Sequence, residues 1–183
     1  MTDDAKSLTY CDALPLHWVP LSEAPDASSL ERLGEANVNL LYKVVSLEER
    51  HRPVHEEGEL EQEISRLHGK MDLLLGLMAT LARERMQLPP SVDVRLSADM
   101  VTWPEACVRP SIGTRVMISI YLSPCIAEPL RLPAIIEQSA YEGSITVRIE
   151  HPSEACYLAL EQHVFLHHRR SIAESRHSSR PKS

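Results

Sequence analysis

Residues 60–81, LEQEISRLHGKMDLLLGLMATL, decide how this chain is organised. Apolar residues recur there at alternating steps of four and three positions, which is the heptad pattern of a coiled-coil helix. The a positions hold Ile64, Met71 and Met78, and the d positions hold Leu60, Leu67, Leu74 and Leu81. Glutamates crowd the start of this segment and arginines lie near its end, as the helix dipole favours.

A second heptad-like helix is predicted just before this one. Its apolar positions run from Leu30 to Leu47. A capping box at Ser28–Glu31 marks its start, and Pro53 marks where it must stop. The two helices are similar in length and joined by a short loop, so an antiparallel hairpin is expected. Asn37 occupies an a-type position, where it either fixes the register of a coiled coil or faces solvent.

The apolar stripe of the second helix is wider than one hairpin partner can cover. Leu75 and Ala82 fall at e positions and Leu77 at a g position, and the first helix adds Leu41. Each leucine left in water forgoes about 1.5–3 kcal/mol of burial energy. The pattern therefore favours self-association through the second helix, as a tetramer rather than a dimer. The alternative is that the two helices pack only on each other.

The remainder of the chain has the period of β-strands. A short extended segment at 14–20 contains prolines that suit an edge strand, and five more strands are predicted after Pro89-Pro90, at 91–97, 100–108, 113–122, 130–138 and 144–150. A closing helix is predicted at 153–170. The predicted fold class is α+β, a six-stranded antiparallel β-barrel with a C-terminal helix and a helical hairpin inserted after the first strand.

This reading divides the chain into four parts. They are an N-terminal segment with the first strand (1–26), the heptad hairpin (27–88), the remainder of the barrel with its closing helix (89–172), and a basic tail (173–183). The tail is expected to be disordered and dispensable, and its alternative role is to dock an acidic partner.

Charge and cysteine content narrow the possible partners. The chain of 183 residues has a formal charge of −7, and residues 1–166 alone carry 14 basic and 25 acidic groups. Such an acidic body disfavours nucleic acid. The four cysteines form no C-x-x-C pair, and the longest apolar stretch is too short for a bilayer. Because the first residues are acidic and no apolar segment follows them, no signal peptide is expected. A cytoplasmic protein with free thiols and no membrane span is expected.

No pattern of catalytic residues stands out. Phosphate-binding glycine loops and a G-x-S-x-G elbow are absent from the sequence. His163 and His167 lie four positions apart on a predicted helix, but no third metal ligand is close in sequence, and histidines at the surface of a helix end are the commoner case. The Glu56–Glu63 run fits a solvated helix start. We therefore predict no enzyme activity, no cofactor and no metal.

The order of five segments resembles the atypical PilZ domain family, in the branch whose inserted heptad helices form tetramers. These segments are Leu14-Pro-Leu-His-Trp-Val-Pro20, the helical insert with Asn39-Leu-Leu41 and Lys70-Met-Asp-Leu-Leu-Leu75, Val94-Arg-Leu-Ser-Ala-Asp-Met100, Pro129-Leu-Arg-Leu132 and His168-Arg-Arg-Ser-Ile172. The resemblance implies a six-stranded PilZ-like barrel, a C-terminal helix and a place in bacterial cyclic di-GMP signalling.

The resemblance also implies where a ligand would bind. Typical PilZ domains use an R-x-x-x-R pair ahead of the barrel and a [D/N]-x-S-x-x-G motif, which aligns here with Arg95–Met100. The candidate ligand-binding residues of this degenerate motif are Arg95, Ser97, Asp99 and Met100. Only Ser97 matches, since Arg95 replaces the acid and Met100 the glycine.

The arginine pair is missing altogether, because no arginine precedes Arg32. We therefore expect weak or absent cyclic di-GMP binding and a signalling adaptor that acts through protein partners. The alternative is a genuine receptor with a non-standard arginine set drawn from Arg95, Arg109, Arg115 and Arg131.

Overall fold

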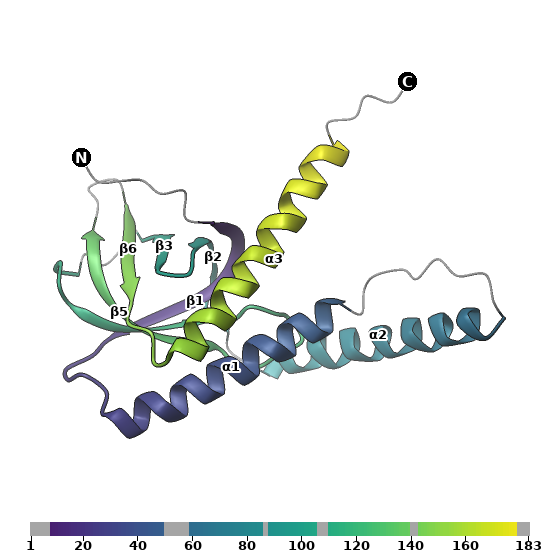
Figure 1. The fold of residues 1–183 in the computed structure, drawn as a ribbon, viewed down its shortest axis with the longest axis horizontal. Helices are drawn as coiled ribbons and strands as arrows, with labels where there is room; N and C mark the ends of the chain where they lie inside the picture. Colours follow the sequence, from purple (N-terminus) through teal and green to yellow (C-terminus); the bar gives the residue numbers. More distant parts are fainter. Residues whose placement is uncertain (1–7, 50–58, 86–87, 106–109, 140–142, 179–183) are drawn as a thin grey trace.

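The structure, a computed structural model, describes residues 8–49, 59–85, 88–105, 110–139 and 143–178 (Figure 1). Six antiparallel strands form a closed barrel in the order β1-β2-β3-β6-β5-β4. The strands are β1 (Tyr10–Pro20), β2 (Ser91–Leu96), β3 (Met100–Pro104), β4 (Arg115–Ile120), β5 (Leu130–Ser139) and β6 (Ser144–Ile149). The helices are α1 (Ala27–Glu49), α2 (Glu59–Arg85) and α3 (Glu154–Ser178). The predicted barrel, its C-terminal helix and the helical insert after the first strand are confirmed.

Strand β1 closes the barrel by pairing with two different neighbours. Its first half, Tyr10–Pro15, pairs with β2, and its second half, Leu16–Pro20, pairs with β4. The expectation of an edge strand is therefore wrong. Pro15 is tolerated because it lies at the point where the pairing changes from β2 to β4. Its missing N–H therefore falls at the end of a run of hydrogen bonds and not within one.

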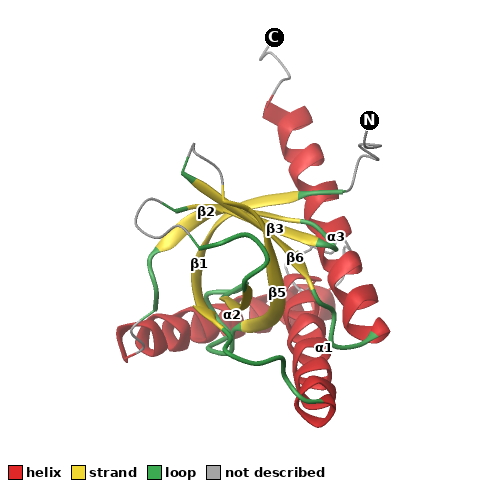
Figure 2. Ribbon diagram, turned by 90° about the vertical axis from the view of Figure 1, so that its left-hand side faces the viewer, coloured by secondary structure: helices red, strands yellow, loops and turns green. Residues whose placement is uncertain are grey.

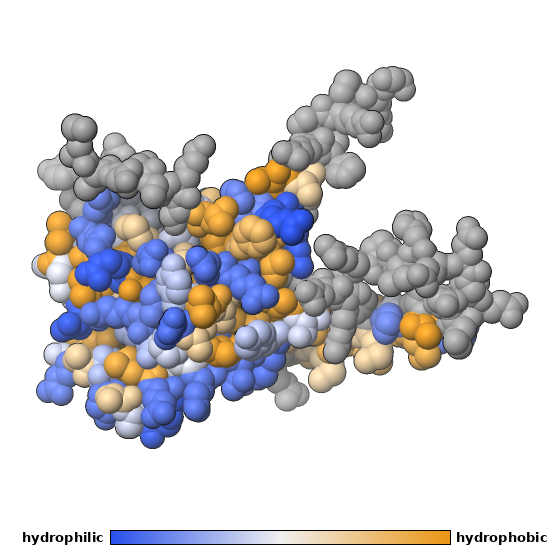
Figure 3. Space-filling view, in the orientation of Figure 1, coloured by the Kyte–Doolittle hydropathy of each residue, from blue (hydrophilic) through white to orange (hydrophobic). Residues whose placement is uncertain are grey.

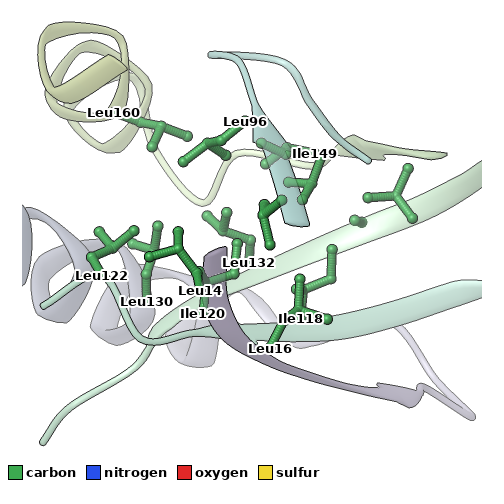
Figure 4. Packing of buried hydrophobic residues seen from close by; sticks show 14 of the residues in the cluster. Leu14, Leu16, Leu96, Ile118, Ile120, Leu122, Leu130, Leu132, Ile149 and Leu160 are labelled. Atoms are coloured by element: carbon green, nitrogen blue, oxygen red, sulfur yellow. The ribbon is translucent and has the colours of Figure 1, made fainter. Parts of the chain in front are cut away.

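The core of the barrel is aliphatic, as the low aromatic content predicts. Inward-facing side chains alternate along each strand and are almost fully buried (Figure 4), among them Leu16, Leu96, Ile118, Ile120, Leu130 and Leu132. Leu160 of α3 packs against the same cluster. Each of these side chains contributes about 1.5–3 kcal/mol when it leaves water, so the barrel has a core of its own, independent of α2.

Helix α1 packs against α3 and β5 rather than along α2. Leu40, Leu41 and Val44 enter the core of the same chain. Gly34 allows the close approach to the segment just before α3, since a Cβ at this position would lie only 3.1 Å from the Ser153 hydroxyl. Figure 2 shows α1 and α3 beside the barrel strands. Within the described residues, α1 and α2 therefore do not form the expected packed hairpin.

Asn37 explains why α1 docks on the barrel. It is buried, and its Nδ2 donates to the carbonyl of Arg131 (2.7 Å) while its Oδ1 accepts from the Arg131 amide (3.1 Å). Strand β6 pairs with β5 only as far as Ala134, so Arg131 has no strand beside it on that side. The Asn37 side chain makes the hydrogen bonds that a neighbouring strand would otherwise make. Both expectations for Asn37, a coiled-coil register and a solvent position, are wrong.

The first turn of α1 is capped by Asp26 rather than by the expected Ser28 box. The Asp26 Oδ1 accepts from the Ser29 amide (2.7 Å) and from the Ser28 hydroxyl (3.1 Å). Hydrogen bonds from Ser29 lower the pKa of this carboxyl, since they favour its charged form. The cap lies two residues earlier than predicted.

Helix α3 is longer than its sequence pattern predicts. It continues through Ser178, so residues 173–178 of the expected disordered tail are helical, and 179–183 lie outside the described residues. Figure 1 shows its end extending away from the barrel. No helix in the described part of the chain has the length and apolar character needed to cross a membrane.

Candidate functional site

The degenerate ligand motif forms the connection between β2 and β3. Ser97 is buried in this turn, where its hydroxyl accepts from the Met100 amide (3.0 Å) and contacts the Met100 carbonyl (3.3 Å). The Ser97 amide donates to the same carbonyl at 2.9 Å. The one residue that matches the motif therefore holds the turn together with its side chain.

The other motif residues lie on the outside of the barrel. Leu96 and Val101 point inward, which leaves Arg95 and Met100 exposed on the outer face. Met100 pairs with Arg148 of β6, and Arg95 pairs with Thr102 of β3. Met100, at the position where the motif has glycine, thus exposes its thioether to solvent. Its side chain occupies space that a ligand approaching the backbone would need.

The alternative arginines do not converge on this turn. Arg131 is on β5, which lies three strands from β2 in either direction around the barrel. Arg115, at the start of β4, is paired with Glu150 at 3.2 Å. Arg109 lies outside the described residues. Of the proposed set, only Arg95 is placed by the structure at the β2–β3 turn.

Arg148, which the sequence reasoning missed, lies on the same outer face as Arg95. The two arginines flank β3, and Arg148 is held by Glu137 of β5 at 2.6 Å. No motif marks Arg148 in the sequence. The strand pairing alone brings it beside Met100.

A polar cluster connects the β2–β3 turn to α3. The His151 ring packs edge-on against Tyr157 with a centroid distance of 5.0 Å. Burial lowers the pKa of His151, and the nearby Ala98 carbonyl and Asp99 carboxylate partly oppose this. The carboxylates of Asp99 and Glu161 raise the pKa of Tyr157. The sequence gives no signal for this cluster, because its members come from three separate elements.

The lowered pKa of His151 predicts a pH-dependent stability. Below the unfolded-state pKa of about 6.5, the unfolded chain binds a proton that the folded ring resists, so stability falls as pH decreases. The urea midpoint should therefore fall less between about pH 7.5 and about pH 5.5 in His151→Gln than in the unmodified protein. His17→Gln, a change of an exposed histidine on β1, serves as the control. Equal falls in His151→Gln and the unmodified protein would contradict the prediction.

His163 and His167 pack α3 against the start of β1 and do not form a surface pair. His163 is buried, its ring centroid lies 4.3 Å from that of His167, and the Tyr10 ring contacts both, at 4.3 Å from His167 and 5.9 Å from His163. The Nδ1 of His168 lies within hydrogen-bond distance, 3.0 Å, of the Thr9 carbonyl oxygen. Among the described residues, no three potential metal ligands come together.

The heptad face of α2 is exposed in the single chain. The described side chains at a and d, Ile64, Leu67, Met71, Leu74, Met78 and Leu81, are each between 45% and 66% exposed. The side chain of Leu60 lies outside the described set. Leu73 and Leu77 are exposed beside them, and Figure 3 shows hydrophobic atoms along the projecting part of α2. Such a face is far more apolar than an ordinary solvated helix surface.

The structure is a small closed antiparallel barrel with a helix packed on its side, and Arg95–Met100 form the end of β2, the β2–β3 turn and the start of β3. The model of one family matches residues 41–177, under the description atypical PilZ domain, cyclic di-GMP receptor. The chain belongs to the atypical PilZ domain family.

A solved structure supports the same assignment. The chain is similar to a pathogenic protein from Xanthomonas campestris, described as a tetrameric PilZ domain self-assembled via a helical bundle. The two share 25% sequence identity with a TM-score of 0.69, and the similarity covers 92% of each chain. No curated protein matches the chain.

Proposed function

We propose that this protein is a non-enzymatic PilZ-type adaptor in bacterial cyclic di-GMP signalling, which self-assembles through α2 and acts through protein partners in the cytoplasm. The observation that carries the proposal is the exposed heptad face of α2. Because α1 packs against α3 and β5, it does not cover the described a and d side chains of α2, which stay exposed and available to other copies. The similar tetrameric PilZ domain supports assembly by this route.

Sedimentation equilibrium tests the assembly. We expect a multiple of the 20.6 kDa chain mass, with four chains favoured because Leu75 and Leu77 widen the stripe beyond a and d. A single species of one-chain mass at micromolar concentration would remove the proposed assembly.

The outer face of the β2–β3 turn supports the proposed adaptor role. Cyclic di-GMP recognition by arginine requires guanidinium groups that grip phosphate or stack on guanine. At this turn the Ser97 hydroxyl bonds the Met100 backbone, and Arg148 is already engaged by Glu137. Among the arginines that the structure describes, only Arg95 is left at this turn to contribute, so binding should be weak or absent.

Calorimetric titration with cyclic di-GMP checks this expectation. We expect no saturable heat, or a Kd weaker than about 1 μM, which corresponds to a binding free energy weaker than about −8 kcal/mol. A tighter Kd would contradict the adaptor proposal and favour a genuine receptor, the role in which the family is described.

The receptor alternative has a structural signature of its own. If cyclic di-GMP binds tightly at the outer face of β3, Arg95→Ala should abolish the heat of binding. Arg131→Ala, which removes an exposed arginine on the far side of the barrel, should leave it unchanged.

A further inference from the structure

A second apolar stripe runs along α3, on the side away from the barrel. Leu158, Phe165 and Ile172 are spaced by seven positions, so about two helical turns separate them and they share one face. They are 52%, 42% and 39% exposed in the single chain. The buried side chains of α3 lie on the opposite face and are Cys156, Ala159, Leu160, His163 and Val164. The α3 stripe is therefore on the solvent side of the helix.

The α3 stripe lies apart from the heptad face of α2. The two helices project from the barrel in different directions (Figure 1). A partner that packs on the α3 stripe therefore does not compete with copies that assemble through α2.

Charged and apolar side chains are arranged evenly about the centre of the α3 stripe. Glu161 lies four positions before Phe165 and Arg169 four positions after it, while Leu158 and Ile172 lie seven positions before and after. Glu161 and Arg169 are both exposed, and neither forms a salt bridge with another described side chain. The stripe therefore carries an acidic residue on one side of its centre and a basic residue at the same separation on the other.

This arrangement is complementary to itself when two copies of α3 run in opposite directions. A two-fold axis at Phe165 places positions that are equally far before and after it opposite one another. Leu158 of each copy then meets Ile172 of the other, each Glu161 meets the other copy's Arg169, and the two Phe165 rings meet at the axis. A parallel pair would instead bring like charges together at both positions, which is unfavourable.

Arg169 and Phe165 are already in contact within one chain. The Arg169 guanidinium lies over the Phe165 ring, 5.6 Å from the ring centroid. This contact restricts the rotamers of both side chains, so less conformational entropy remains to be lost when two copies pair.

We propose that α3 pairs antiparallel with α3 of a second copy of this chain, with Phe165 at the two-fold axis, and that this contact joins separate α2 assemblies. The second part of the inference rests on the proposed self-assembly through α2. One pair of helices is expected to bury less than the roughly 1,200–2,000 Å² of a stable interface, so isolated chains should not pair at micromolar concentration. An α2 assembly carries several copies of α3, which multiplies the contacts that it can make.

Charge exchange tests this contact. In a homogeneous pair, Glu161→Arg would place arginines opposite each other, and Arg169→Glu would place glutamates opposite each other. Each protein is assembled separately, and its weight-average mass is measured by sedimentation equilibrium at about 5 μM and about 100 μM, a range suited to a small interface. Because pairing joins two particles, the mass of the unmodified protein should rise about twofold or more between the two concentrations.

Neither variant alone should show this rise. An equimolar mixture of the two preassembled variants should regain it, because each introduced side chain then meets the opposite charge on the other particle. A merely structural effect of either substitution would not be reversed by mixing.

The matched control is Glu23→Arg, which makes the same change of charge as Glu161→Arg at an exposed position outside α3. It should show the same rise in mass as the unmodified protein. At the lower concentration, all three variants should keep the assembled mass and the thermal unfolding midpoint of the unmodified protein.

The outcomes separate the α3 pair from assembly through α2. An assembled mass that does not rise with concentration overturns the α3 pair and leaves the α2 assembly in place, and it is the result expected if the α3 stripe docks a different, acidic protein. A rise that persists in either single variant, or that does not return in the mixture, also overturns the α3 pair.

A one-chain mass of the unmodified protein at the lower concentration overturns the α2 assembly. In that case a two-chain mass at the higher concentration, removed by each charge exchange and restored by mixing, would still support the α3 pair. A one-chain mass at both concentrations overturns both proposals.

Discussion

Leu74→Asp is expected to reduce the solution mass to that of one chain, 20.6 kDa. Leu74 is a central d position and is 60% exposed in the single chain, so an aspartate there is tolerated in the monomer. In an assembly, each copy would bring a carboxylate into an apolar seam without a partner. Desolvating such a charge costs several kcal/mol per copy.

The control for this variant is Leu73→Asp. Leu73 is exposed to a similar degree, 65%, but occupies a c position outside the seam. It should keep the assembled mass. Thermal unfolding should show that the barrel persists in Leu74→Asp, because its core does not include α2. A Leu74→Asp protein that sediments like the unmodified one would show that α2 does not form the seam.

Asn37→Asp is expected to destabilise the fold by about 3 kcal/mol or more at neutral pH. The new carboxylate still accepts from the Arg131 amide, but it faces the Arg131 carbonyl where Nδ2 now donates at 2.7 Å. Its buried site raises the pKa of the introduced carboxyl, since burial disfavours the charged form. The loss of stability should therefore grow as pH rises above the unfolded-state value of about 3.9.

Asn39→Asp provides the comparison, because it makes the same chemical change on the exposed side of α1. Urea unfolding of both variants at one fixed protein concentration should show a large fall in midpoint for Asn37→Asp only. Equal midpoints would mean that the Asn37–Arg131 contact contributes little to docking α1.

The sequence predicts those features that depend on local periodicity. The heptads of α2, and the alternation of apolar and polar residues along strands such as β4, are patterns among neighbouring residues. The types of the elements, and from them the barrel, could therefore be predicted. Asn37 was misread because its partner, the backbone of Arg131, is 94 positions away and no local pattern marks it. The helix cap was predicted at Ser28 but is made by Asp26, because several residues near the start of α1 can accept hydrogen bonds from its first free amides.

The candidate site was predictable only in part. The motif alignment selected Arg95–Met100 because these residues are continuous in sequence, and the structure places them at the end of β2, in the turn and at the start of β3. Arg148 and His151 were missed because only strand pairing and the packing of α3 bring them to the turn. The length of α3 was underestimated because its last residues lack apolar periodicity.

The division of β1 between two neighbours has a consequence for the rate of folding. Pro15 pairs with Ser91 and Leu16 with Ile120, so the barrel closes only when segments about 76 and 104 positions apart meet. Contacts of such high sequence separation make folding slow, because loop-closure entropy is lost before the contacts form. During synthesis α2 is complete before any of the other five strands exists, and chains emerge at about 5–20 residues per second. The apolar helix is therefore available to other nascent chains for seconds before its own barrel can form, and association can precede closure.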